Sequence, residues 1–172
     1  MRRQGKTDDA ITQFAKAVEI RPSYAKAHNN LGEALAARGD INDAIGHYEK
    51  ALKANPNCAE AYNNRGVALT DLKKYNQAIQ DYDKAIDLHP RFAAAHNNRG
   101  IVYANLKQYD RAIQDYGKAM ELNPTYAKAY VTRGLVYILL LELDKACPDL
   151  KKACDLGVCD ALEFATKKGF CY

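Results

Sequence analysis

Four of the five prolines in this chain stand 34 residues apart, at Pro22, Pro56, Pro90 and Pro124. Other residue types repeat in step with them. The glycines are Gly32, Gly66, Gly100 and Gly134, the aromatic residues are Phe14, Tyr48, Tyr82 and Tyr116, and two alanine series start at Ala10 and Ala17. A fixed period of this length predicts a stack of similar supersecondary units with a continuous core, rather than a globule around one closed core. Function is therefore expected along the face of the stack.

The unit 25–58 contains two segments with helical periodicity. Small and apolar residues recur every three or four residues from Ala27 to Leu35 and again from Ile41 to Leu52, with a polar break at 38–40 between them. Pro56 ends the second segment, because proline cannot continue a helix and disfavours the helical conformation of the residue before it. Each unit is therefore predicted to be two antiparallel helices joined by a short turn, which gives an all-α fold.

Gly32 and its three equivalents lie in the middle of a predicted helix, where glycine costs about 1 kcal/mol relative to alanine. Because the glycine recurs in four units, we expect another helix to need the space that a side chain would fill. The aromatic residues, leucines and isoleucines are expected to fill the remaining core.

The combination of a 34-residue helix–turn–helix unit with small, aromatic, alanine and proline positions resembles the tetratricopeptide repeat family. The resemblance covers about residues 5–157. Tryptophan is absent and Val158 stands where a proline is expected. The usual place of the tryptophan is taken by His28, Tyr62, His96 and Tyr130. The resemblance implies a right-handed α-solenoid of antiparallel helix pairs that binds a partner in its concave groove.

The register of the repeat predicts one solenoid domain over residues 5–172. Residues 5–24 match only the second helix of a unit, and residues 160–169 are predicted to form a capping helix over the last hairpin. The full units between them are 25–58, 59–92, 93–126 and 127–159. The half repeat has an apolar face that the next unit covers on one side only. We expect the uncovered side to attract either a missing upstream helix or another molecule, and predict a contact between chains there. The residues of this face are Ile11, Phe14, Ala15 and Val18.

Charge and hydropathy argue against several classes of function. The net charge is +4 with acids and bases interspersed, so nucleic acid is not an expected partner. The longest apolar run, Leu135–Leu141, is too short for membrane insertion. No Ser–His–acid, Cys–His or paired-carboxylate arrangement stands out, and a solenoid offers no enclosed pocket for chemistry. We therefore expect no enzymatic activity, cofactor or metal.

The first helix of each unit carries adjacent asparagines on the face where the family resemblance places ligand contacts. These pairs are Asn29-Asn30, Asn63-Asn64 and Asn97-Asn98, and the same face carries Lys26, Lys128 and Thr132. Each amide offers two donors and an acceptor, which suits the backbone of an extended peptide. The row resembles the asparagine ladder in the repeat region of O-linked N-acetylglucosamine transferase. The alternative is that these asparagines are solvated or bond to neighbouring repeats.

The fourth unit changes the character of this face, which becomes apolar at Leu135, Ile138 and Leu139. Two interpretations are open: the terminal helix covers these residues, or they form an apolar pocket for one anchor side chain of a bound peptide. The carboxylate clamp of chaperone-binding family members is not matched. Lys128 has a suitable position, but Thr132 replaces the arginine that the clamp needs.

Two positions vary together within the chain. Three units pair an arginine on the first helix with an aspartate on the second, as Arg65 with Asp81, Arg99 with Asp115, and Arg133 with Asp149. The first unit has neither, with Leu31 and His47 at these positions. Because the two positions lie at a similar height in an antiparallel hairpin, we predict an ion pair inside each of the three units.

Four of the five cysteines lie near the end of the chain, at Cys147, Cys154, Cys159 and Cys171. Their spacing is not that of a zinc site. Buried thiols and a disulfide on the cap are both open. If residues 160–169 fold back antiparallel to the preceding helix, Cys171 comes level with Cys147, which makes this pair the candidate disulfide.

The pattern as a whole predicts a non-enzymatic interaction scaffold that binds an extended segment of a partner protein. The alternative is the repeat arm of a larger enzyme, such as a glycosyltransferase, that presents substrates to a catalytic domain outside this chain. The compartment is left open, since a half repeat suggests a fragment. The cytoplasm is slightly favoured, and the periplasm if the terminal cysteines are bonded.

Overall fold

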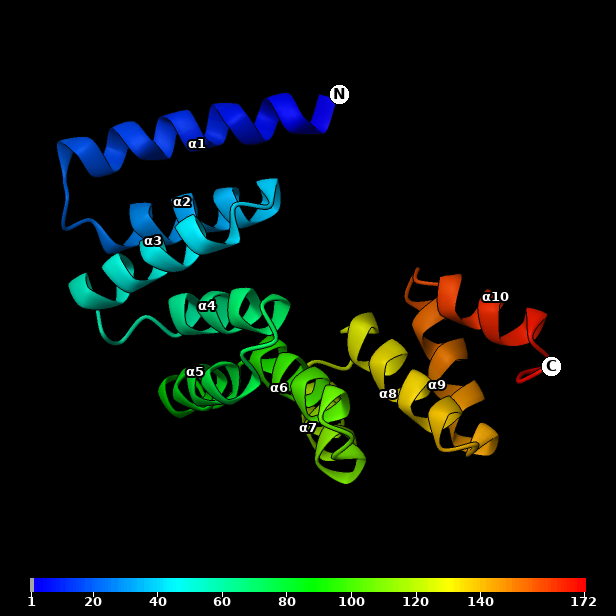
Figure 1. Ribbon diagram of the computed structural model, residues 1–172. Coiled ribbons are helices and arrows are strands. Elements are labelled where there is room, and N and C mark those ends of the chain that lie inside the picture. The colour runs from blue at the N-terminus through cyan, green and yellow to red at the C-terminus, as the bar shows by residue number, and fades with distance from the viewer. Residues whose placement is uncertain (1) are drawn as a thin grey trace. The chain divides into compact units, whose positions relative to one another are not determined.

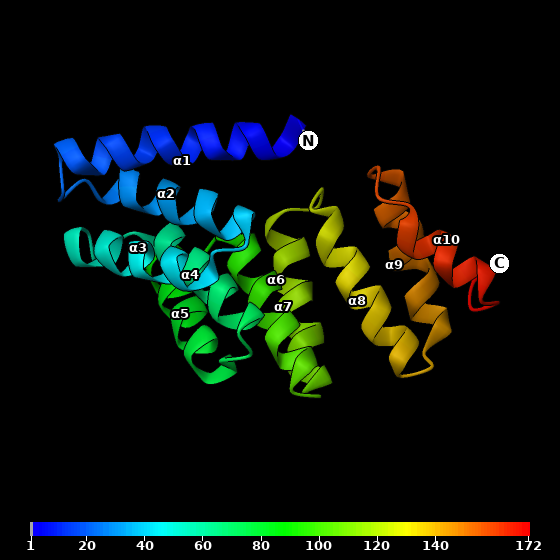
Figure 2. The same ribbon diagram turned by 45° about the horizontal axis from the view of Figure 1, so that its top comes forward.

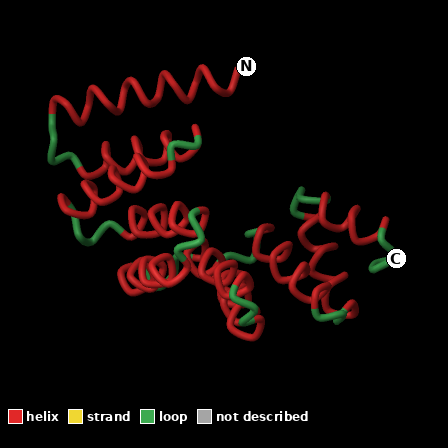
Figure 3. Tube along the Cα trace, in the orientation of Figure 1, coloured by secondary structure: helices red, strands yellow, loops and turns green. Residues whose placement is uncertain are grey.

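The computed structural model describes the backbone of residues 2–172 and the side chains of residues 7–172. Within this range the secondary structure is entirely helical (Figure 3). The helices are α1 (Arg2–Ile20), α2 (Ala25–Arg38), α3 (Ile41–Ala54), α4 (Ala59–Asp71), α5 (Tyr75–Leu88), α6 (Ala93–Asn105), α7 (Tyr109–Leu122), α8 (Ala127–Leu139), α9 (Leu143–Asp155) and α10 (Asp160–Lys167). The predicted fold class, an all-α solenoid of antiparallel helix pairs, is confirmed.

The chain divides into two units, residues 1–90 and 91–172. In the first, α2 packs against α1 and α3, and α4 packs against α3 and α5 (Figure 1). In the second, α6 pairs with α7 and α8 with α9, while α10 lies on α9 (Figure 2). Each helix pair corresponds to one predicted repeat.

The turn between the two helices of a repeat needs one residue in the left-handed backbone conformation. In the first full repeat this residue is Gly39, with φ of 102°. The equivalent residues of the later repeats have side chains, yet adopt φ of 57°, 59° and 61° at Lys73, Lys107 and Leu141. A left-handed residue with a side chain costs about 1–2 kcal/mol, so the later turns are held against a local preference by the packing of their helices.

The glycine of each first helix makes room for a large side chain of the second. A Cβ atom built on Gly32 would lie 2.7 Å from Tyr48 Cε1, which is too close for real atoms. The predicted packing role of the glycines is therefore confirmed. The same clash arises for Gly66 with Tyr82, Gly100 with Tyr116 and Gly134 with Leu150.

The opening helix packs on the first full repeat. Ile11, Phe14 and Val18 of α1 are partly buried against the core around Leu31 and Tyr48. By contrast, Ala15, which the sequence assigned to the apolar face, is exposed. The helix begins at Arg2, three residues before the predicted start of the half repeat at residue 5.

Two disulfides join the C-terminal segment to α9. Cys147 and Cys171 have Sγ atoms 2.03 Å apart, which is the pair singled out from the sequence, and Cys171 is buried beside Leu150. A second bridge that the sequence did not suggest links Cys154 to Cys159 at 1.95 Å. It forms because the chain reverses between α9 and α10 and brings these near neighbours together.

Candidate functional site

The three predicted Arg–Asp pairs are present. Asp81 accepts hydrogen bonds from Arg65 Nε at 2.7 Å and Nη2 at 2.6 Å. The bond to Asp81 raises the pKa of Arg65. The other two pairs have the same two-bond geometry, with distances of 2.7–2.9 Å for Arg99 with Asp115 and for Arg133 with Asp149.

In the first repeat, Leu31 and His47 stand at the two positions of this ion pair, and His47 pairs with His28. His28 Nδ1 lies 3.0 Å from His47 Nδ1, and His28 Nε2 lies 3.0 Å from the carbonyl oxygen of Pro22. Because a carbonyl only accepts, His28 Nε2 carries a proton, and in the neutral ring Nδ1 then accepts from His47. His28 is buried, as expected from its packing position, but its pairing with His47 was not foreseen.

The asparagine pairs divide into two roles. The first member of each pair, Asn29, Asn63 and Asn97, is buried. Asn29 Oδ1 accepts from Asn64 Nδ2 of the following repeat at 3.2 Å, and Asn97 Oδ1 accepts from the Thr132 hydroxyl at 3.0 Å. Asn29 and Asn97 therefore tie neighbouring repeats together, and contact of the asparagines with a ligand stays a prediction.

The second members differ in how much hydrogen-bonding capacity they retain. Asn64 donates to Asn29 and accepts from Asn63 Nδ2 at 3.3 Å. Asn30 is half-buried, and its amide has no hydrogen bond to any of the side chains or backbone groups that the structure describes. In contrast to Asn64, Asn30 therefore keeps both amide donors and its carbonyl acceptor available for a ligand.

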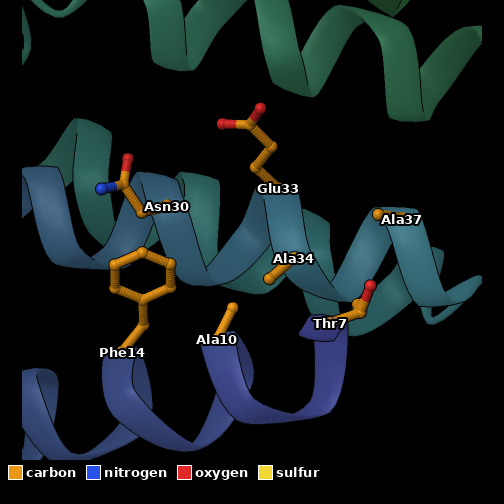
Figure 4. A pocket seen from close by; sticks show the side chains of 7 residues that line it. All are labelled: Thr7, Ala10, Phe14, Asn30, Glu33, Ala34 and Ala37. Atoms are coloured by element: carbon orange, nitrogen blue, oxygen red, sulfur yellow. The ribbon is translucent and has the colours of Figure 1, made fainter. Parts of the chain in front are cut away.

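Asn30 stands at the edge of a hollow of about 460 Å³ between α1 and α2 (Figure 4). The ring of Phe14 points from α1 toward Asn30, while Ala10 and Ala34 face each other beside it. The Glu33 carboxylate points away from α1 and from the two alanines. The hollow exists because alanines occupy the contact between the two helices. Its lining residues are Thr7, Ala10, Phe14, Asn30, Glu33, Ala34 and Ala37.

The apolar residues of the fourth repeat are divided between the two interpretations. Ile138 packs into the cluster that the cap forms with Leu150 and Ala165. Leu135 and Leu139 remain 38% and 67% exposed. The cap therefore covers one of the three residues and leaves a smaller apolar surface than the sequence suggested.

The remaining predicted site residues, Lys26 and Lys128, are exposed on the first helices of their repeats. Among the described residues, no group of three or more histidines, cysteines, aspartates or glutamates is arranged to hold a metal ion. None of the described helices combines the length and apolar character that a membrane crossing needs.

Comparison with known proteins agrees with this architecture. The sequence profile of the tetratricopeptide repeat matches residues 25–58, 59–92 and 93–126, and a second profile for the TPR repeat matches residues 1–37. No curated protein matches the chain.

Several solved structures share the fold over nearly the whole chain. MamA is 30% identical with a TM-score of 0.75, and the match covers 91% of each chain. YrrB, described as a TPR protein with an unusual peptide-binding site, is 25% identical with a TM-score of 0.71, covering 95% of this chain and 84% of YrrB. TTC0263 of Thermus thermophilus is 24% identical with a TM-score of 0.81, covering 95% and 89%, and supports the fold alone. The chain therefore belongs to the tetratricopeptide repeat family and is a protein-interaction scaffold.

Proposed function

We propose that the chain binds an extended segment of a partner protein along the first helices of its repeats, without catalysing a reaction. The second asparagines, Asn30, Asn64 and Asn98, bond to the backbone of that segment. The observation that carries this proposal is the uncommitted amide of Asn30 at the edge of an open hollow.

The hydrogen-bonding inventory supports a role in backbone recognition. An asparagine amide has two N–H donors and an oxygen that accepts two bonds. Asn64 uses one donor and one acceptor site for Asn29 and Asn63, so a donor and an acceptor site remain. An extended peptide presents the same pair of groups at each residue and is recognised through them whatever its side chains.

The buried first asparagines prepare this surface. The hydrogen bond that Asn64 donates to Asn29 holds the Asn64 amide in one orientation before a ligand binds. A group that is already ordered loses less conformational entropy on binding. No feature of the described residues favours the alternative of a repeat arm that serves a catalytic domain.

A library of random extended peptides displayed on phage tests the proposal. Peptides selected on the wild-type chain are synthesised, and their affinity for the triple variant Asn30→Ala, Asn64→Ala, Asn98→Ala is measured by calorimetry. Three lost hydrogen bonds of about 1 kcal/mol each predict an affinity about 100-fold weaker. Asn42→Ala with Asn76→Ala, on exposed faces of α3 and α5, is the matched control and should bind normally. Failure to select any peptide, or unchanged affinity in the triple variant, would refute the proposal.

A further inference from the structure

We propose that the hollow between α1 and α2 is a subsite for a basic residue, a lysine or arginine, of the bound segment. This inference rests on the proposed function, since it names the side chain that enters beside Asn30. It requires an unpaired carboxylate, a wall for an aliphatic stem, and a reason to reject other side chains.

Glu33 supplies the carboxylate. It is exposed at the edge of the hollow and forms no ion pair with any side chain of residues 7–172. Lys26 lies seven residues earlier on the same helix, about 10 Å along its axis, which is beyond the reach of a salt bridge. The carboxylate of Asp8, the residue after the lining residue Thr7, is already paired with Arg38 at 3.5 Å. Among the described side chains, no cation therefore neutralises Glu33, and its charge can attract one.

The hollow supplies the wall. Ala10, Ala34 and Ala37 leave a floor without large side chains, bounded by the ring of Phe14 (Figure 4). Lysine and arginine bury their methylene stems on apolar surface of this kind and keep the charged head group at the rim. The Glu33 carboxylate points away from α1, beyond Ala34, so a stem that crosses the alanines from the α1 side brings its head group to the carboxylate. The Asn30 amide, one turn before Glu33, is placed for the backbone of the same residue.

The site is particular to the first repeat. The residues equivalent to Glu33 in the later repeats are apolar, namely Val67, Ile101 and Leu135. An acidic side chain in the hollow would be repelled by the Glu33 carboxylate. An apolar side chain would desolvate this carboxylate without forming a hydrogen bond or ion pair with it. Both penalties favour a basic residue at this point of the bound segment.

The test uses the full chain and the peptides selected from the phage library. We expect lysine or arginine to be enriched at one register position. Glu33→Gln should bind such a peptide about tenfold more weakly, whereas the peptide with norleucine in place of the basic residue should bind both proteins equally. Glu33→Lys should select acidic residues at the same position. Glu19→Gln, on an exposed part of α1 outside the hollow, is the matched control and should bind as the wild type does.

The outcomes separate this inference from the function on which it rests. Peptides that bind and depend on the asparagines, but show no basic preference or bind Glu33→Gln unchanged, would overturn the basic subsite alone. If no peptide binds the wild-type chain, both ideas are wrong.

Discussion

The first and second full repeats, residues 25–58 and 59–92, solve the same packing problem with different chemistry. Both place a glycine against a tyrosine where their helices approach each other. At the next contact along the hairpin, the second repeat has the Arg65–Asp81 ion pair, whereas the first has Leu31 with the His28–His47 pair nearby. The close approach of the two helices is therefore common to both repeats, whereas the polar contact beside it differs. We infer that both residues of this contact must change together.

The largest loss of stability is expected when one residue of the ion pair is removed and the other is left. Asp81→Ala leaves the Arg65 guanidinium, partly buried, without its two hydrogen bonds, and should lower the free energy of unfolding by about 3 kcal/mol. The double variant Arg65→Leu, Asp81→His copies Leu31 and His47 of the first repeat, with Tyr62 kept at the position of His28, and should be less destabilised than Asp81→Ala. Urea denaturation measures both. A double variant as unstable as the single one would show that the two repeats are not equivalent here.

A smaller loss of stability is expected from changes at the glycine–tyrosine contact that both repeats share. Gly32→Ala and Gly66→Ala each push a Cβ atom to 2.7 Å from a tyrosine ring. Overpacking of this kind costs about 1–3 kcal/mol, and the better helix propensity of alanine returns up to about 1 kcal/mol. Both variants should therefore lose about 1–2 kcal/mol in urea denaturation. A large difference between them would mean that one repeat packs more loosely than the other.

The histidines give the first repeat a pH dependence that the ion pair does not share. Burial, with help from Lys50 and His28, lowers the pKa of His47 in the folded chain. The unfolded chain then binds more protons below its own histidine pKa of about 6.5, so stability is lost as the pH falls below that value. Wild type should lose stability relative to His47→Gln in urea titrations between about pH 7 and pH 5. Parallel curves would contradict this account.

The smallest effect concerns the turns. Replacing Lys73, whose φ is 57°, with glycine relieves a left-handed side chain but loosens the unfolded chain, for a net gain of about 0.5 kcal/mol. The opposite change in the first repeat, Gly39→Ala, should lose about 1 kcal/mol. Thermal melts of the two variants should shift in opposite directions. Shifts in the same direction would show that backbone conformation does not govern these turns.

The features that repeat in sequence were predictable, because a period reports on contacts that every unit makes. The 34-residue spacing indicated the helix pairs, and the mid-helix glycines indicated the close approach to Tyr48 and its equivalents. The ion pairs could be predicted because two repeat positions vary together: every full repeat with an arginine at the position of Arg65 has an aspartate at the position of Asp81.

The features that depend on one unit meeting another were not predictable. Asn29 and Asn30 are adjacent and chemically identical, yet one is buried and the other is available, because burial depends on how α4 and α1 rest on α2. The hollow beside Phe14 likewise depends on how α1 packs against α2. The Cys154–Cys159 bridge depends on the chain reversal before α10, which sequence spacing alone does not specify.

The hydrogen bond from Asn64 to Asn29 and that from Thr132 to Asn97 each span 35 residues, one more than the repeat period. In the first of these bonds, repeat 25–58 provides the acceptor Asn29 and the following repeat 59–92 provides the donor Asn64. Duplication of a whole repeat such as 59–92 would create a junction with both partners already in place. The arrangement makes the array extensible by copying, with the specialised ends of the chain left untouched.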